Sequence, residues 1–219
     1  MGTANGIAIN SKCLISDVNI RNASGVSNTA YYIFGNDINI KGGDLTDCRY
    51  GVSFQVVPCN NIKCTDLNIR NVHEAFYDHN GLIDSVIENN NIYTTASFGI
   101  NCLAGTVNTK IKNNNFYEGQ MCGIYGKISN SDISENNFIN MGIAAYASAY
   151  PSILIISTVG DNFIKGNRVR NSRAGHVGIR NDAVPVTPNI VSKNDLRYAA
   201  AAQVLSLHES DINDENFTL

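Results

Sequence analysis

The side chains best suited to proton transfer and charge neutralisation fall in three short segments, about 24 residues apart in the sequence. They are Tyr77, Asp78, His79, Asn101, Tyr125 and Lys127. β-Elimination from a uronic acid requires a base, a proton donor and a group that neutralises a carboxylate. Asp78, His79 and Lys127 are therefore the candidate catalytic residues. Tyr77, Asn101 and Tyr125 are candidate substrate-binding residues, and either tyrosine could also donate a proton.

Composition and charge exclude several other kinds of chemistry. The net charge of −3 and the pI near 5.8 argue against a nucleic-acid footprint. The longest apolar stretch, Ser152 to Val159, is far shorter than the ~18 residues that span a bilayer, so no membrane insertion is expected. The six cysteines form no CxxC pair, and no histidine lies at zinc-finger spacing. We expect inert thiols, with disulfides between coils as the alternative, and neither a metal nor a cofactor.

One repeat organises the whole chain and sets where these residues lie. Each unit has an apolar residue and, five residues later, a second one, usually preceded by Asn or Asp. The first apolar positions are Ile15, Ile40, Cys64, Ile87, Ile111, Ile133, Ile164, Val191 and Ile212. The second are Ile20, Leu45, Ile69, Ile92, Phe116, Phe138, Val169, Leu196 and Phe217. The unit recurs every 21 to 31 residues, which is too short for helix-pair repeats.

Such a unit can hold three short strands and three turns. The segments are rich in Ile, Val, Phe and Tyr and are bounded by Asn, Gly and Asp, which is typical of strand and turn. Stacking the units in parallel gives three sheets around a narrow apolar core. The sequence therefore predicts one all-β domain over residues 1–219: a single-stranded, right-handed parallel β-helix of about nine coils.

Asparagines form a column of their own between the two apolar positions. Asn90, Asn114, Asn136, Asn167 and Asn194 occupy the same step in five consecutive coils. Identical amides stacked about 4.8 Å apart can hydrogen-bond to one another. Asn also tolerates the left-handed conformation that a tight bend needs. We expect this column to be structural.

The outward residues of another strand in each unit predict a binding strip. This strand is often opened by glycine, and alternation turns Tyr77, His79, Asn101, Tyr125 and Lys127 outward. Strips of this composition suit sugars, because rings stack on apolar sugar faces and amides bond hydroxyls. The plain alternative is a polar solvent face on which tyrosine is merely a good strand former.

Two long coils suggest walls for this strip. Their extra residues fall after the glycine-opened strand, which we place at Gly142-Ile-Ala-Ala in the seventh coil. The first insertion, from Ala144 to Thr158, carries Tyr146 and Tyr150, and the second carries Arg180 and Asp182. Insertions in solenoids often map to the binding face. These four residues join the candidate substrate-binding set.

Asp78 has two open interpretations. Alternation puts it at an inward position, and buried carboxylates gather at functional sites. Alternatively, it caps a turn with Asn80 and Gly81. Hydrolysis needs two carboxyl groups about 5 to 10 Å apart. Asp78 and Asp182 are separated by about four coils, ~19 Å at the inter-strand spacing, so they cannot pair directly. Glu74 is nearer to Asp78 but lies on the same strand segment, and a trimer could supply the second carboxylate from another chain.

The repeat resembles a known superfamily. Units such as Gly99-Ile-Asn-Cys, combined with Ile-x-x-Asn-Asn units such as that at Ile87, are similar to the coils of pectin-lyase-like β-helices. That superfamily includes pectate lyases, polygalacturonases, alginate epimerases and phage tailspike depolymerases. The resemblance extends from Gly6 to Phe217. Tyr77-Asp78-His79-Asn80 is similar to the Trp-Ile-Asp-His segment of pectate lyases, without the tryptophan, and the polygalacturonase motifs are absent.

The resemblance implies a polysaccharide partner and leaves two functions open. The first is a tailspike-like domain that binds polysaccharide and cleaves it as a lyase or a glycosidase. The second is a non-catalytic structural or adhesin-type β-helix. Coils reach from residue 6 to Phe217 and leave no residues for caps, so we expect a fragment or protomer of a larger assembly. Tailspike resemblance implies a homotrimer on a virion tail or at a cell surface.

Overall fold

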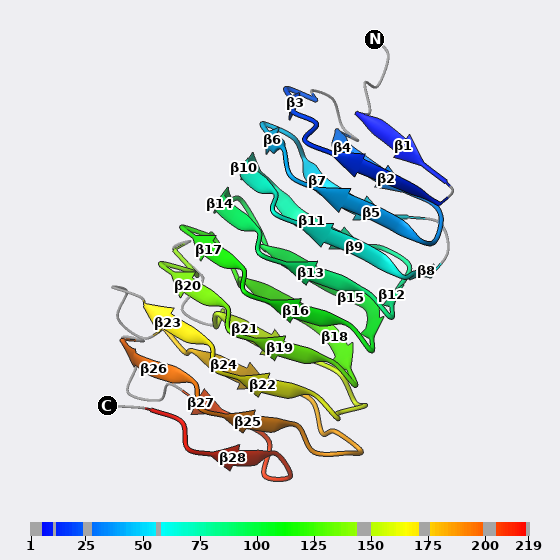
Figure 1. The fold of residues 1–219 in the computed structure, drawn as a ribbon. Coiled ribbons are helices and arrows are strands. Elements are labelled where there is room, and N and C mark those ends of the chain that lie inside the picture. Colours follow the sequence, from blue (N-terminus) through cyan, green and yellow to red (C-terminus); the bar gives the residue numbers. More distant parts are fainter. Residues whose placement is uncertain are drawn as a thin grey trace.

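Three parallel β-sheets form the whole of the described structure. The computed structural model describes residues 6–10, 12–23, 28–55, 58–143, 150–170, 176–198 and 205–217. Within these ranges the regular elements are all strands. Figure 1 shows the coils stacked from the N-terminal end to the C-terminal end, so that each coil packs on its neighbours. The right-handed parallel β-helix predicted from the repeat is confirmed.

Each coil contributes one strand to each sheet in turn, except that two coils add a second strand to sheet A and the last coil has no sheet C strand among the described residues. Sheet A contains β1 (Ile7–Ile9), β4 (Thr29–Ile33), β7 (Tyr50–Phe54), β11 (Glu74–Asp78), β15 (Ile100–Val107), β18 (Ile124–Ser129), β21 (Ile153–Ile155), β24 (Ile179–Asn181) and β27 (Leu205–Ser206), with β8 (Cys59–Asn60) and β12 (Leu82–Ile83) beside them. Sheet B contains β2 (Cys13–Ser16), β5 (Ile38–Lys41), β9 (Ile62–Thr65), β13 (Val86–Glu88), β16 (Lys110–Lys112), β19 (Asp132–Ser134), β22 (Phe163–Lys165), β25 (Ile190–Ser192) and β28 (Ile212–Asp214). Sheet C contains β3 (Ile20–Arg21), β6 (Asp44–Thr46), β10 (Asn68–Val72), β14 (Asn91–Thr95), β17 (Asn115–Tyr117), β20 (Asn137–Ile139), β23 (Arg168–Arg170) and β26 (Asp195–Tyr198).

The apolar columns of the repeat form the core. Ile87, Ile111 and Ile133 are direct neighbours in sheet B and are buried. Phe116 and Phe138 stack in sheet C with ring centroids 4.7 Å apart. The columns therefore point inward as the five-residue spacing predicts.

The asparagine column is a continuous hydrogen-bonded ladder. Asn114 is fully buried, and its Nδ2 donates to Oδ1 of Asn136 at 3.1 Å and to the carbonyl of Ile87 at 2.9 Å. Its own Oδ1 accepts Nδ2 of Asn90 at 2.9 Å. The ladder continues through Asn167, Asn194 and Asn216. The structural role expected for this column is confirmed.

The ladder asparagines do not themselves adopt the left-handed conformation that was expected of them. The left-handed residues of this bend are those one step earlier, such as Asp66, Asn89 and Asn113, with φ between 54° and 59°. Asn90 and Asn114 are not among the positive-φ residues. Asparagine is needed in the ladder for its amide, which both donates and accepts.

The last coil departs from the expected register by one residue. Val191 pairs with Asn213 and Ile190 pairs with Ile212. Asn216 therefore lies in the buried ladder column instead of the position before the second apolar residue. Ile212 and Phe217 remain 49% and 54% exposed. No further coil stacks on β28 in the described structure, so the apolar pattern there does not translate into burial.

The seventh coil also differs from the sequence-based assignment. Its sheet A strand is β21, and not Gly142-Ile-Ala-Ala. Ile153 and Ile155 align with Ile124 and Gly126 of β18. β21 thus lies inside the segment from Ala144 to Thr158 that the sequence assigned to the first insertion, and the extra residues of this coil come before the strand, between β20 of sheet C and β21 of sheet A. Gly142 followed by small apolar residues has the same pattern as a strand opening, but it is Ile153 and Ile155 of β21 that fill the core.

Candidate functional site

The predicted strip exists as one outward column of sheet A. Tyr77, Asn101 and Tyr125 are register neighbours on three consecutive coils. Leu154 and Arg180 continue the same column. Leu154 thus takes the place in this column that the sequence assigned to the Gly142-Ile-Ala-Ala strand.

A second, diagonal relation joins residues 27 positions apart on neighbouring coils. The three pairs are Tyr50 with Tyr77, Glu74 with Asn101, and Phe98 with Tyr125. The two aromatic pairs stack at 4.6 Å and 4.4 Å, with nearly parallel rings. Asn101 Nδ2 donates to Oε2 of Glu74 at 3.1 Å. The polar Glu74–Asn101 pair therefore lies between the two stacked aromatic pairs along the helix axis.

Stacking changes how the aromatic residues can meet a sugar. In each stacked pair one ring covers one face of the other, so each ring has at most one face left for a sugar. The contact of these rings with sugar faces stays a prediction. The tyrosine hydroxyls can also form hydrogen bonds with a sugar.

Tyr77, on β11, and His79, directly after this strand, form a hydrogen-bonded pair. The hydroxyl of Tyr77 lies 3.0 Å from Nδ1 of His79. Burial raises the pKa of Tyr77, so its phenol stays protonated at neutral pH. His79 is exposed. Together with Arg49, Tyr50 and Gln55 they line a pocket of about 190 Å³.

Glu74 lies beneath the aromatic residues with its carboxyl group largely removed from solvent. It is 5% exposed, and burial raises its pKa to about 7 despite the hydrogen bond from Asn101. The N–H groups of His73 and Glu74 both donate to the carbonyl of Arg49, so the pairing is irregular there and simple alternation fails. Nδ1 of His73 is 3.6 Å from Oε1 of Glu74. Burial and the guanidinium of Arg49 lower the pKa of His73.

Asp78 faces the interior, as alternation predicts, and its carboxyl group is hydrogen-bonded there. It aligns with Phe54 in the previous coil and is 2% exposed. Oδ1 accepts the backbone N–H of Gly81 at 2.6 Å, and Oδ2 accepts the hydroxyl of Thr106 at 2.9 Å. Burial raises its pKa to about 6. This geometry corresponds to the turn-capping interpretation and directs the carboxyl group away from the pocket.

The remaining candidates lie farther toward the C-terminal end. Tyr150 approaches Phe98 edge-on at 6.2 Å, next to Tyr125. Arg180 donates to Asp182 at 2.6 Å. Lys127 is exposed on β18, directly after Gly126. Tyr146 lies outside the described residues.

The described residues contain no group of three His, Cys, Asp or Glu side chains arranged to hold a metal ion. All six cysteines are free, and all but the half-buried Cys13 are buried. No helix in the described part of the chain is long and apolar enough to cross a membrane.

The sequence did not predict Arg49 and Tyr50 as members of this cluster, and it offered Glu74 only as a carboxyl group near Asp78 on the same strand segment. Glu74 does carry a signal, because the equivalent positions in the coils on either side are Tyr50 and Phe98. An acid in an otherwise aromatic column is a departure from the repeat. Tyr50 and Arg49 carry no such signal, since aromatic and basic residues are common on strands.

Comparison with known proteins identifies the fold. No protein-family model and no curated protein sequence matches the chain. The solved alginate lyase from Paenibacillus sp. str. FPU-7 is 14% identical with a TM-score of 0.58, over 99% of this chain and 88% of that chain. DFA-IIIase from Arthrobacter chlorophenolicus A6 without its lid is 13% identical with a TM-score of 0.64, over 97% of this chain and 55% of that one. Pectate lyase Pel9A is 13% identical with a TM-score of 0.63, over 98% of this chain and 63% of that one.

These likenesses show that the chain shares the parallel β-helix fold of these solved structures. The chain spans little more than half the length of the DFA-IIIase chain and less than two thirds of the pectate lyase chain. Fold does not determine activity.

Proposed function

We propose that the protein binds an acidic polysaccharide on sheet A and cleaves it by β-elimination. The observation that carries the proposal is the Tyr77–His79 pair, 3.0 Å apart, in a pocket that also contains the Arg49 guanidinium. Two of the structural neighbours are named as lyases of alginate and of pectate.

The reaction can be balanced with this pair alone. Nε2 of His79 takes the proton from C5 of a uronate unit, next to its carboxylate. The C4–O4 bond breaks and a C4=C5 double bond forms. Tyr77 gives its hydroxyl proton to the leaving O4, and Nδ1–H of His79 passes its proton to Tyr77. One proton has then moved from C5 to O4, and both side chains are neutral again.

Arg49 supplies the group that neutralises the uronate carboxylate, which elimination needs besides a base and a proton donor. Proton loss at C5 places charge on the uronate carboxylate, and a cation beside that carboxylate stabilises it. The Arg49 guanidinium lies over the Tyr50 ring at 5.0 Å, at the edge of the pocket. A planar guanidinium also fits a carboxylate in a bidentate manner.

Elimination is favoured over hydrolysis by the positions of the carboxyl groups. A glycosidase needs two that flank the sugar at about 5 to 10 Å. Asp78 faces the interior, and Asp182 follows β24, four strands beyond β11 in sheet A. Glu74 is then left without a partner carboxylate on this face among the described residues.

The test is incubation with polygalacturonate and with alginate, followed by ultraviolet absorbance of the unsaturated product. We expect Tyr77→Phe and His79→Gln each to lower the rate by about a hundredfold or more, as loss of acid–base catalysis does. Tyr117→Phe, a stacked tyrosine on sheet C, is the matched control and should retain full activity. New reducing ends without absorbance would indicate hydrolysis and refute elimination.

A non-catalytic binding or adhesin-type domain is the second candidate. It is favoured by Glu74 and Asn101, which bond to each other and are each 5% exposed. Binding of polysaccharide by the parent protein without any product would select it. A tailspike-like trimer on a virion or cell surface stays part of the proposal, to be tested by the mass in solution.

A further inference from the structure

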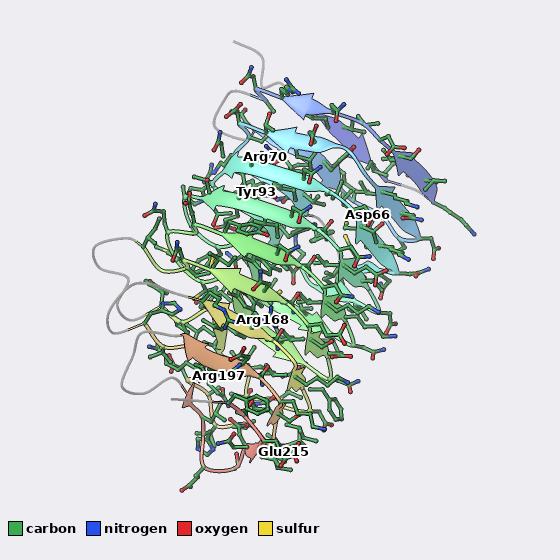
Figure 2. The ribbon with its side chains drawn as sticks, turned by 60° about the vertical axis from the view of Figure 1, so that its left-hand side comes forward. Asp66, Arg70, Tyr93, Arg168, Arg197 and Glu215 are labelled. Carbon is green, nitrogen blue, oxygen red and sulfur yellow. The ribbon has the colours of Figure 1, made fainter. Side chains whose placement is uncertain are left out.

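An open hollow of about 470 Å³ lies at the corner where sheet C turns into sheet A. It is lined by residues 71–73, residues 94–96 and Gln120, which belong to three consecutive coils. Figure 2 shows Arg70 and Tyr93 on β10 and β14, two of the strands that lead into this corner. We call it the corner hollow. Its volume is within the range of about 300–1,000 Å³ that is usual for ligand pockets.

A small residue between two longer ones opens the corner hollow. The N–H of Ala96 donates to the carbonyl of Val72, and that of Gln120 donates to the carbonyl of Thr95. His73, Ala96 and Gln120 therefore take equivalent positions on three consecutive coils. Adjacent coils are about 4.8 Å apart. Ala96 is exposed, so the middle coil presents only a methyl group between the His73 and Gln120 side chains.

Thr94, in the wall of the hollow, has a disfavoured backbone conformation. Its φ of 52° is left-handed, and of the described left-handed residues other than glycine Thr94 alone is β-branched. The equivalent residues of the neighbouring coils are Asn71 and Glu118. A β-branched residue is an outlier in this conformation, and residues held in such conformations gather at functional sites. The strain at Thr94 therefore coincides with a hydroxyl placed at the hollow.

The polar groups of the hollow are available to a ligand. The Thr94 hydroxyl and the Gln120 side-chain amide have no hydrogen-bond partner in the part of the chain that the structure describes. Nδ2 of Asn71 donates to Asp47 at 3.3 Å, which leaves its Oδ1 as an acceptor. Hydroxyl and amide groups both donate and accept, so this set suits a ligand rich in hydroxyls.

The lining of the hollow is uncharged at neutral pH. Of the described residues that line it, only His73 titrates near neutrality, and burial and the guanidinium of Arg49 lower its pKa. Its imidazole is therefore neutral. Glu74 lies 3.6 Å from Nδ1 of His73, but it is 5% exposed and does not line the hollow. A neutral lining favours a neutral ligand over an acidic one.

We infer that the corner hollow binds a neutral sugar unit. Its hydroxyls would bond to the three polar groups of the lining, and its apolar face would lie against Ala96. The site is separate from the pocket on sheet A, because the two share no lining residue among those described, although His73 approaches Tyr50 edge-on at 6.4 Å. The inference does not depend on whether sheet A is catalytic.

The test is saturation-transfer NMR of the whole chain with D-galactose, D-glucose and D-mannose, and with D-galacturonate as the charged comparison. We expect at least one neutral sugar to bind, and to bind more tightly than galacturonate. Ala96→Leu, which fills the hollow, should abolish that binding. Ala104→Leu is the matched control: it adds the same side chain at an exposed position of β15, outside the hollow, and should bind like the parent.

Three further variants separate this site from folding and from sheet A. Gln120→Ala should weaken binding by about fivefold, the effect of one hydrogen bond. Thr94→Gly should weaken it by a similar factor without lowering the melting temperature, because glycine adopts the left-handed conformation at no steric cost. His79→Gln, which lacks the proposed base of sheet A, should bind the sugars like the parent. Failure of this site and failure of the sheet A proposal are therefore distinguishable.

Three outcomes would overturn the inference. The first is that none of the three neutral sugars binds the parent. The second is that Ala96→Leu and Ala104→Leu bind sugar equally well, which would place the sugar elsewhere. The third is that galacturonate binds more tightly than the neutral sugars and is lost in Ala96→Leu, which would make the ligand acidic.

Discussion

At the scale of single residues, burial determines how Glu74 responds to pH. Its pKa of about 7 in the folded chain lies above the ordinary value of 4.5. Between pH 4.5 and pH 7 the Glu74 carboxyl group is largely ionised in the unfolded chain but largely protonated in the folded chain. The folded state therefore binds more protons, and its stability falls as pH rises through this range. The loss is complete above pH 7 and on the order of 3 kcal/mol.

Glu74→Gln should therefore remove part of this pH dependence. We expect its free energy of unfolding, measured by urea denaturation from pH 4.5 to 8, to fall less than that of the parent. Glu135→Gln, at an exposed corner position, serves as the control and should follow the parent. Parallel curves for Glu74→Gln and the parent would show that Glu74 is solvated.

Glu74 should also influence substrate binding, because its charge acts on Arg49. Below pH 7 the protonated carboxyl group of Glu74 adds no charge beside Arg49. Above pH 7 the ionised carboxylate lowers the positive potential that a uronate carboxylate meets there. We expect the KM for oligogalacturonate to rise several-fold between pH 6 and pH 8, by the amount typical of an ion pair of about 1 kcal/mol. In Glu74→Gln the KM should stay flat, and a KM that rises equally in both proteins would contradict this role.

At the scale of elements, the ladder of buried amides joins the coils. Asn114 accepts from Asn90 and donates to Asn136 and to the Ile87 carbonyl. Asn114→Ala leaves buried partners without hydrogen bonds, and should lower the free energy of unfolding by roughly 1–3 kcal/mol. Asn115→Ala, one residue away at a half-buried position, is the control and should have a smaller effect. Equal, small losses would mean that water replaces the amide.

Close approach between strands explains the glycines of sheet A. A Cβ at Gly123 would lie 2.4 Å from Cε1 of Phe138, a buried ring already stacked on Phe116. Gly123→Ala should lower the free energy of unfolding by about 1–3 kcal/mol, the usual result of overpacking. Thermal denaturation measures this. In the double variant Gly123→Ala, Phe138→Leu part of the loss should be recovered, and no recovery would assign the effect to the backbone.

At the scale of the whole molecule, exposed apolar residues gather toward the C-terminal end. Phe163, Ile190 and Ile212 form one outward column of sheet B, and Val186, in the connection before β25, is 84% exposed. Larger exposed apolar patches often mark contacts between proteins. We expect the chain to self-associate, and Phe163→Ser with Val186→Asp to lower the mass measured by sedimentation equilibrium. A parent that is monomeric at every concentration would contradict the predicted oligomer.

Some features were determined by the sequence itself. A strand turns successive side chains to opposite faces, so apolar residues at a fixed spacing translate directly into stacked columns such as Ile87, Ile111 and Ile133. For the same reason the buried amide ladder and the outward column of Tyr77, Asn101 and Tyr125 follow from counting along the repeat. These features depend only on local geometry repeated from coil to coil.

Other features were decided only by tertiary structure, because they depend on where neighbouring coils place their side chains. The diagonal contact of Glu74 with Asn101 needs an irregular strand, and the raised pKa of Glu74 needs the burial that results. The seventh coil could be assigned to either of two apolar segments, and packing against β18 selects β21. In the last coil the register shifts by one residue, so that Asn216 continues the amide ladder from Asn194 while Ile212 and Phe217 stay about half-exposed.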